Sequence, residues 1–216
     1  MKLAKPLMIS LIIIMPLMIF LSAAHLAGFN GPFYKEEFSK YNVEKNAPDA
    51  VELHRKVVDY IKGKSDYLPD RFNEREKKHL HDVRRLVLLS KAALYSLTAL
   101  AGILVILSAR KIWKRRDLEQ FVGSILLLGG LLTLALSALL LLSINSNFSS
   151  SFESFHKIFF QQGTYAFDPD YEVVVNLYPE ELFMDLGLRI AKGIVITSLI
   201  IVALGIYFLF KPKKQK

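Results

Sequence analysis

The chain contains no cysteine, which excludes disulfide bonds, a thiolate nucleophile and a lipidated cysteine of its own. It also lacks the Gly-x-Ser-x-Gly pattern that presents a serine nucleophile in many hydrolases. Asp and Glu are missing from four long apolar segments, residues 7–26, 86–108, 121–143 and 188–210. Each is long enough to cross a hydrocarbon core of ~30 Å, which takes roughly 20 residues. Runs of this length satisfy their backbone groups in lipid as helices, so a soluble protein is excluded.

We therefore expect an all-α membrane protein with four transmembrane helices, forming a single polytopic domain over residues 1–216. The outer loops, residues 28–85 and 144–187, are long enough for a small, mostly helical cap but not for an independent domain with a large core. The first segment has an alternative interpretation as a cleavable signal peptide, with Lys2, Lys5 and the small residues 22–24 as its signals. Its apolar run exceeds a usual signal core and contains Pro16, so we expect it to be retained.

The distribution of charge predicts the orientation in the cell membrane. Five basic residues lie between positions 110 and 116, and further lysines mark both termini. Residues 144–185 carry seven acidic residues and only one lysine, Lys157. The positive-inside rule then places both termini in the cytoplasm and the two long loops outside. The net charge of +8 is explained by this topology and by anionic lipid headgroups, without nucleic acid as a partner.

The outer loops contain signals for several short elements. Asn46 and Pro48 predict the start of an amphipathic helix that ends near residue 64. Asn73 and Glu76 form a capping box whose helix should run through His81 into the second span. In the second loop, Gly163 is a predicted helix C-cap, and the β-branched run 172–177 is consistent with a short strand. Residues 179–181 predict the start of a helix that continues into the fourth span.

Two of the five histidines stand out. His156 lies within residues 152–160, where four of nine residues are Phe. Exposing this much apolar surface to water is unfavourable, so the segment is unusual for a loop that faces water. His81 precedes the second apolar segment and is expected at the outer membrane interface. Histidine can act as acid and base near neutral pH, so these two are the candidates for catalysis. His25 and His54 are interpreted as ordinary interfacial or solvated residues, and His79, in a charged run, as part of a solvated face.

A metal site is the alternative to acid–base chemistry. Residues 76–79 and 153–156 both read Glu-x-x-His, a pair found in di-iron helical bundles. Those sites also need inward glutamates from two further helices, which the spans of this chain do not provide. His79 and His81 are two residues apart and would point in nearly opposite directions on a helix. We therefore expect neither a metal nor a cofactor.

Several motifs resemble the membrane lipoprotein intramolecular transacylase family. They are His81-Asp82-Val83 before the second span, residues 155–160 (Phe-His-Lys-Ile-Phe-Phe), Asp168-Pro169, residues 177–183 (Leu-Tyr-Pro-Glu-Glu-Leu-Phe) and residues 59–61 (Asp-Tyr-Ile). The four spans with both termini inside fit the same family. The resemblance implies an acyltransferase that moves the sn-2 acyl chain of a diacylglyceryl lipoprotein to the amine of its N-terminal cysteine, giving the lyso-form.

The resemblance also implies catalytic residues and a substrate pocket at the boundary of cap and membrane. The two catalytic histidines carry over onto His81 and His156. The pocket aromatics are then Phe155, Phe159, Phe160, Tyr165 and Phe167. Glu153, Asp82, Arg85 and Lys91 are candidates for supporting groups. Glu153 either orients His156 or faces water, and Lys91 has the alternative of extending to the lipid headgroups.

Two other classes of function remain open at this point. One is a non-enzymatic membrane assembly or accessory protein whose outer cap binds a partner. The other is a small channel or transporter, which would need polar or broken helices at the bilayer midplane. Gly129 and Gly130 are the only hint of such a break, and small residues more often mark helix packing.

Overall fold

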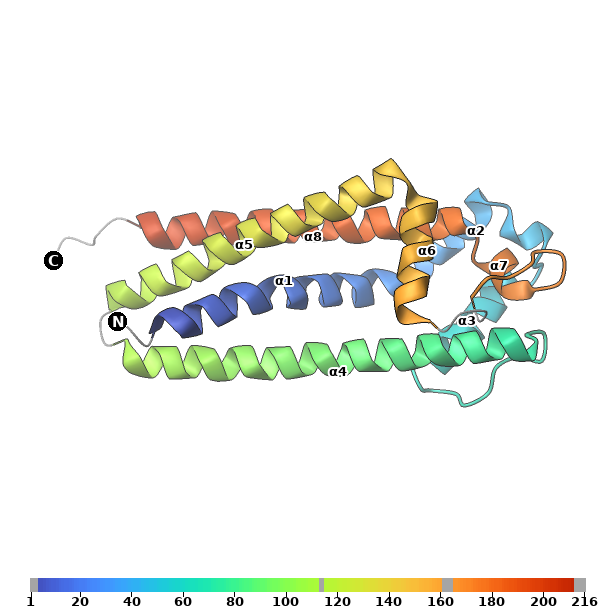
Figure 1. Cartoon of the computed structure of the whole chain (residues 1–216), viewed down its shortest axis with the longest axis horizontal. Helices are drawn as coiled ribbons and strands as arrows, with labels where there is room; N and C mark the ends of the chain where they lie inside the picture. Colours follow the sequence, from blue (N-terminus) through green and yellow to red (C-terminus); the bar gives the residue numbers. More distant parts are fainter. Residues whose placement is uncertain (1–3, 113–114, 161–164, 212–216) are drawn as a thin grey trace. The chain divides into compact units, whose positions relative to one another are not determined.

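A computed structural model of the chain describes residues 4–112, 115–160 and 165–211, and all regular elements among them are helices (Figure 1). Four of the helices are long and apolar enough to cross a membrane: α1 (Ala4–Gly28), α4 (Glu74–Lys111), α5 (Arg115–Ser146) and α8 (Glu180–Phe210). The expected all-α membrane fold with four spans is confirmed. The chain divides into two compact units, which are described separately.

The first unit, residues 1–24, 93–142 and 190–216, holds most of the length of the membrane helices. Glycines allow α5 and α8 to approach closely. A Cβ atom added at Gly205 would lie 2.5 Å from the backbone nitrogen of Leu127, and one added at Gly130 would lie 2.7 Å from Val202 Cγ2. Gly129 and Gly130 lie inside the continuous helix α5, so they serve helix packing and do not break the span.

The second unit, residues 25–92 and 143–189, is the cap with the adjoining ends of the long helices. Its own elements are α2 (Gly31–Lys40), the 3-10 turn η1 (Val43–Lys45), α3 (Ala50–Ile61), α6 (Phe148–Phe159) and α7 (Val173–Leu177). Asn30 caps α2 by accepting a hydrogen bond from the backbone N–H of Phe33. Asn147 caps α6 in the same way, through the N–H of Ser150. These caps fix where each short helix begins.

The cap has a dry core. Phe38 of α2, Val57 of α3, Phe72, Leu177 of α7 and Leu182 of α8 are all at most 1% exposed. A polar pair lies next to this core. His54 Nδ1 is 3.0 Å from the hydroxyl of Tyr178, and that hydroxyl is buried. Burial lowers the pKa of His54 to about 4. The cap is therefore held by hydrophobic burial. Of the two expected environments for His54, interfacial or solvated, the solvated one does not apply, because the side chain is half-buried against Tyr178.

Two predicted helix starts are confirmed. Asn73 and Glu76 form a reciprocal capping box at the start of α4, and that helix runs without a break through His81 into the membrane segment. The helix that starts after Pro179 likewise continues as α8 into the fourth span. The predicted amphipathic helix is α3, whereas α2 was not foreseen. The C-cap predicted at Gly163 lies outside the described residues.

The strand predicted over residues 172–177 is wrong. Val173–Leu177 form the short helix α7, and Tyr178 N–H donates to the Val174 carbonyl at 2.9 Å. The Asn176 side chain donates to the Glu172 carbonyl at 2.9 Å, and Val174 N–H donates to the buried carboxylate of Glu76. The helical turn and the side chains of Asn176 and Glu76 thus satisfy this backbone, so the β-branched residues need no partner strand.

Candidate active site

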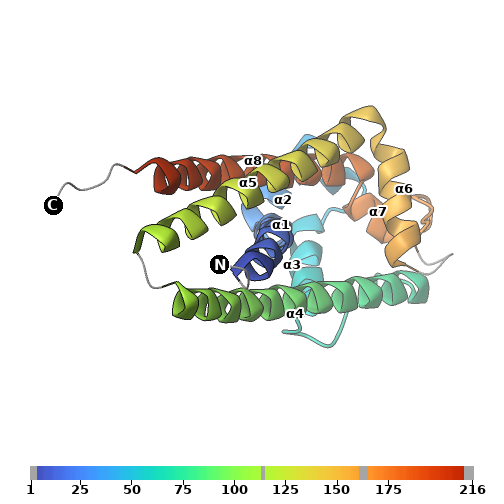
Figure 2. The ribbon, with the colours of Figure 1, turned by 60° about the vertical axis from the view of Figure 1, so that its left-hand side comes forward.

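The candidate active site contains two stacked imidazoles, His79 on α4 and His156 on α6. Their ring centroids are 6.1 Å apart, with 21° between the ring planes. α6 runs from the end of α5 toward α4 (Figures 1 and 2). Both residues belong to the cap unit. The structure therefore brings together one histidine of the first outer loop and one of the second.

His156 is held in a defined tautomer. Its Nδ1 lies 2.7 Å from the backbone carbonyl of Phe152, one helical turn earlier. A carbonyl oxygen only accepts, so Nδ1–H donates, and in the neutral ring the Nε2 lone pair is left free. Burial lowers the pKa of His156, while the bond to Phe152 raises it. His156 is therefore a neutral base whose reactive nitrogen is Nε2.

His79, and not His81, faces His156. His79 is only 8% exposed, and its Nδ1 is buried without a hydrogen-bond partner. The expectation that His79 lies on a solvated face is wrong, because it shares the buried side of α4 with Glu76 and Leu80. The side chain of His81 is 67% exposed, and its Nδ1 lies 3.8 Å from Asp82. Two residues of separation turn His81 to the opposite side of the helix.

Aromatic rings surround the histidine pair. Phe160 lies 4.7 Å from His79 and 5.3 Å from His156, measured between ring centroids. Phe167 lies 5.3 Å from His79, and Tyr165 lies 5.3 Å from His156. Phe152, which the sequence interpretation left out of the pocket, is closest to His156 at 4.3 Å. The pair thus sits among apolar walls that limit contact with water.

Two other predicted pocket residues lie at the outer side of α6. The Phe155 ring is 5.7 Å from His156, and the Phe159 ring lies tilted against Phe155, with the centroids 4.8 Å apart. Phe155 and Phe159 are 45% and 50% exposed. They continue the aromatic surface away from the imidazoles and do not enclose them.

An ion pair between Arg75 and Glu172, called the ionic tie below, anchors the segment that contains Phe167. Arg75 donates to both carboxylate oxygens of Glu172, at 2.9 and 2.7 Å, and also to the Ala166 carbonyl. The Glu172 side chain is 7% exposed and accepts the Asp168 N–H at 2.7 Å. The Arg75 guanidinium also lies over the Phe167 ring, 5.2 Å from its centroid. These bonds fix the position of Phe167 against His79.

Of the four predicted supporting residues, Glu153, Arg85 and Lys91 lie away from the pair. Glu153 is paired with Lys157 at 2.7 Å, and its side chain is 60% exposed, so it faces water. Asp82 lies next to His81 but also one helical turn after His79: burial lowers the pKa of His79 to about 4, and the charge of Asp82 opposes this shift. Arg85 and Lys91 are exposed, and they follow His79 on α4 by ~9 and ~18 Å along the axis at ~1.5 Å per residue. In the structure the Phe152 carbonyl, and not Glu153, orients His156.

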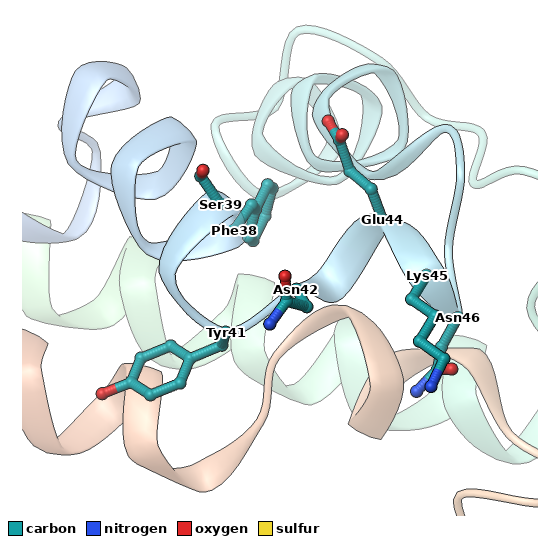
Figure 3. Close-up of a pocket in the computed structure, with 7 residues that line it drawn as sticks. All are labelled: Phe38, Ser39, Tyr41, Asn42, Glu44, Lys45 and Asn46. Atoms are coloured by element: carbon teal, nitrogen blue, oxygen red, sulfur yellow. The ribbon is translucent and has the colours of Figure 1, made fainter.

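No group of three His, Asp or Glu side chains among the described residues is placed to hold a metal ion. A surface hollow of the cap is formed by the end of α2 and by η1 (Figure 3). It is lined by Phe38, Ser39, Tyr41, Asn42, Glu44, Lys45 and Asn46. None of these residues contacts the histidine pair, so the hollow is separate from the candidate active site.

Comparison with known proteins points to one family. Residues 9–183 match the sequence profile of the lipoprotein intramolecular transacylase Lit. Among curated proteins, none matches this chain.

Solved structures agree with the profile. The membrane integral lipoprotein intramolecular transacylase from Bacillus cereus superposes with a TM-score of 0.83 at 23% sequence identity, covering 97% of both chains. Two structures of that enzyme with one histidine replaced, by arginine or by alanine, superpose with TM-scores of 0.79. Both are 23% identical and cover 97% of this chain, and the alignments cover 93% and 95% of those chains. At this identity the superposition shows a shared fold.

Proposed function

The chain belongs to the family of lipoprotein intramolecular transacylases, and from this premise we propose which acyl chain it moves and which residues move it. The enzyme is an acyltransferase and a multi-pass membrane protein. Its substrate in this proposal is a diacylglyceryl lipoprotein. The sn-2 acyl chain passes from the glyceryl oxygen to the α-amine of the N-terminal cysteine, and the product is a lyso-form lipoprotein.

The observation that carries the proposal is the stacked pair of His79 and His156. Attack of an amine on an ester needs a base for the amine proton and a proton for the departing glyceryl oxygen. It needs no enzyme nucleophile, which suits a chain without cysteine. In this assignment His79 takes the place that the sequence interpretation gave to His81.

The reaction balances with a single proton, which His156 moves in two transfers. The free Nε2 of His156 takes a proton from the attacking amine as the new C–N bond forms. The bond from carbonyl carbon to glyceryl oxygen then breaks, and the same proton passes to that oxygen. His79, neutral and buried beside His156, donates a hydrogen bond to the carbonyl oxygen as negative charge develops there. No second substrate is consumed.

The surroundings of the pair favour this route. The amine and the ester belong to one molecule, and holding them in a reactive conformation can contribute ~7–11 kcal/mol in well-oriented cases. Phe160, Tyr165 and Phe167 supply walls that exclude water from the ester and so suppress hydrolysis. Their role in the proposal is to confine the substrate.

We also propose that this site lies on the outer face of the membrane. The support is the concentration of basic residues at the termini and at positions 110–116, on the opposite ends of the spans from the cap. Both termini are then cytoplasmic.

The test uses a synthetic diacylglyceryl lipopeptide with different chains at sn-1 and sn-2, incubated with the purified protein in vesicles. Tandem mass spectrometry should find the sn-2 chain on the cysteine amine. A mixture of two isotope-labelled lipopeptides should give no crossed products, because the transfer is intramolecular. Transfer of the sn-1 chain, crossed products or release of free fatty acid would overturn the proposal.

A further inference from the structure

Helix α6 carries a third kind of surface besides its catalytic and polar sides. Its inner side holds His156 and Phe152, and Phe152 packs on Phe183 of α8 with ring centroids 5.2 Å apart. Its polar side carries the ion pair of Glu153 and Lys157. The remaining side is an exposed apolar patch of Phe155, Ile158 and Phe159, which are 45%, 75% and 50% exposed.

Chain continuity fixes where this patch lies. α5, which is long and apolar enough to span the membrane, ends at Ser146, and α6 begins after the single capping residue Asn147. A second tie joins α6 to the first turn of α8, where Ser149 donates a hydrogen bond to Glu180. α6 is only ~18 Å long at ~1.5 Å per residue. It therefore starts where two membrane helices reach the surface of the bilayer on the cap side.

We propose that α6 lies in the membrane interface and inserts Phe155, Ile158 and Phe159 into the hydrocarbon of the leaflet on the cap side. A helix with one apolar and one charged side takes this position in the boundary between headgroups and acyl chains. Exposing three large apolar side chains to water would be unfavourable, whereas the lipid that surrounds α5 can cover them. The patch is thus a lipid-docking surface.

This position has a consequence for catalysis, which rests on the function proposed above. Phe155 and His156 are neighbours on α6, so insertion of Phe155 holds His156 near the boundary between hydrocarbon and headgroups. The ester carbonyls of a membrane-anchored lipid lie at this same boundary. The acyl chains of the substrate therefore stay in the bilayer, and only the ester and the amine enter the site.

The test measures the depth of α6 by fluorescence. The single tryptophan, Trp113, is replaced by Phe, and a new reporter is introduced by Ile158→Trp or, as the matched control, by Lys157→Trp on the polar side. Each variant is reconstituted in phosphatidylcholine vesicles whose acyl chains carry bromine near the headgroup, which quenches a nearby indole. The Ile158→Trp reporter should emit at shorter wavelength and lose most of its fluorescence, and the Lys157→Trp reporter should lose little.

Equal quenching of the two reporters, or an unquenched Ile158→Trp reporter with emission typical of water, would overturn the proposal. Quenching that disappears as the protein-to-lipid ratio rises would mean that a second copy of the chain covers the patch, which also overturns it. The readout does not depend on acyl transfer. A negative result here therefore leaves the proposed reaction standing, and failure of the reaction leaves this result intact.

Discussion

The imidazoles of His79 and His156 stack with their centroids 6.1 Å apart, although one comes from the start of a long membrane helix and the other from a short amphipathic helix. The Phe152 carbonyl fixes the tautomer of His156, and burial keeps that ring neutral by lowering its pKa. Aromatic rings separate the pair from water. These features together are what acid–base chemistry on a lipid ester requires.

Loss of the ionic tie between Arg75 and Glu172 should impair catalysis without removing a catalytic group. Glu172→Gln keeps the shape of the side chain but loses the charge that Arg75 binds at two points. A charge-assisted hydrogen bond contributes about 1.5–3 kcal/mol, so Phe167 should lose its fixed position against His79. We expect about a tenfold lower rate of acyl transfer, since each ~1.4 kcal/mol of barrier is tenfold in rate.

The matched control for Glu172→Gln is Glu153→Gln, which removes the exposed ion pair with Lys157. Such a pair contributes at most about 1 kcal/mol, and its loss should leave rate and thermal stability nearly unchanged. Equal rates for the two variants would show that the tie does not position the site.

His54 should make the cap unstable in acid. Burial lowers its pKa to about 4 in the folded protein, from about 6.5 for an exposed histidine, so between these values the unfolded chain binds more protons. Stability should therefore fall as pH drops from 6.5 toward 4, by roughly 3 kcal/mol in total. His54→Gln should make the dependence of the melting temperature on pH less steep in this window, and His79, whose pKa burial also lowers to about 4, should keep its own contribution. His81→Gln, which removes an exposed imidazole, is the matched control.

The close packing of α5 on α8 predicts that substitution of two glycines of α8 affects stability differently. Gly205→Ala places a Cβ atom 2.5 Å from the backbone nitrogen of Leu127, which must move, and overpacking typically costs about 1–3 kcal/mol. Gly193→Ala meets no atom within 4 Å. In thermal unfolding in detergent, the Gly205→Ala variant should melt lower than the parent and the Gly193→Ala variant should not. Equal melting temperatures would contradict the packing of α5 on α8.

The cysteine-free chain allows a direct test of orientation. Asp170→Cys, in the exposed loop before α7, should react in intact cells with a maleimide that cannot cross the membrane. Asp117→Cys, at the start of α5, should react only after the cells are lysed. The reverse pattern would place the active site in the cytoplasm.

Much of the fold could be predicted from the sequence because its determinants are local. The four apolar runs specify helices by length alone. The capping box of Asn73 and Glu76 involves only four consecutive residues, and the structure contains it as predicted. The prediction of a strand over residues 172–177 was wrong because the structure of this segment depends on distant groups: Val174 N–H bonds to Glu76.

The site was half predictable. His156 was marked by its aromatic neighbours, but the choice between His79 and His81 depends on which side of α4 is buried. A signal was present, because Glu76, His79, Leu80 and Val83 follow helical spacing on one face, and that face is turned to the cap interior. The charged residues around His79 hid this pattern. Phe167 was named among the pocket aromatics, but the ion pair of Arg75 and Glu172 that fixes its position could not be foreseen, because these two residues are far apart in sequence.

The most direct test of the central claim compares alanine variants of His79, His81 and His156 by mass spectrometry of the N-terminal peptide of a lipoprotein from cells that express each variant. His79→Ala and His156→Ala should abolish the lyso-form product, while the variants remain folded in the membrane. His81→Ala should give the product at nearly the level of the parent protein. Loss of product in His81→Ala, together with retained product in His79→Ala, would contradict the account.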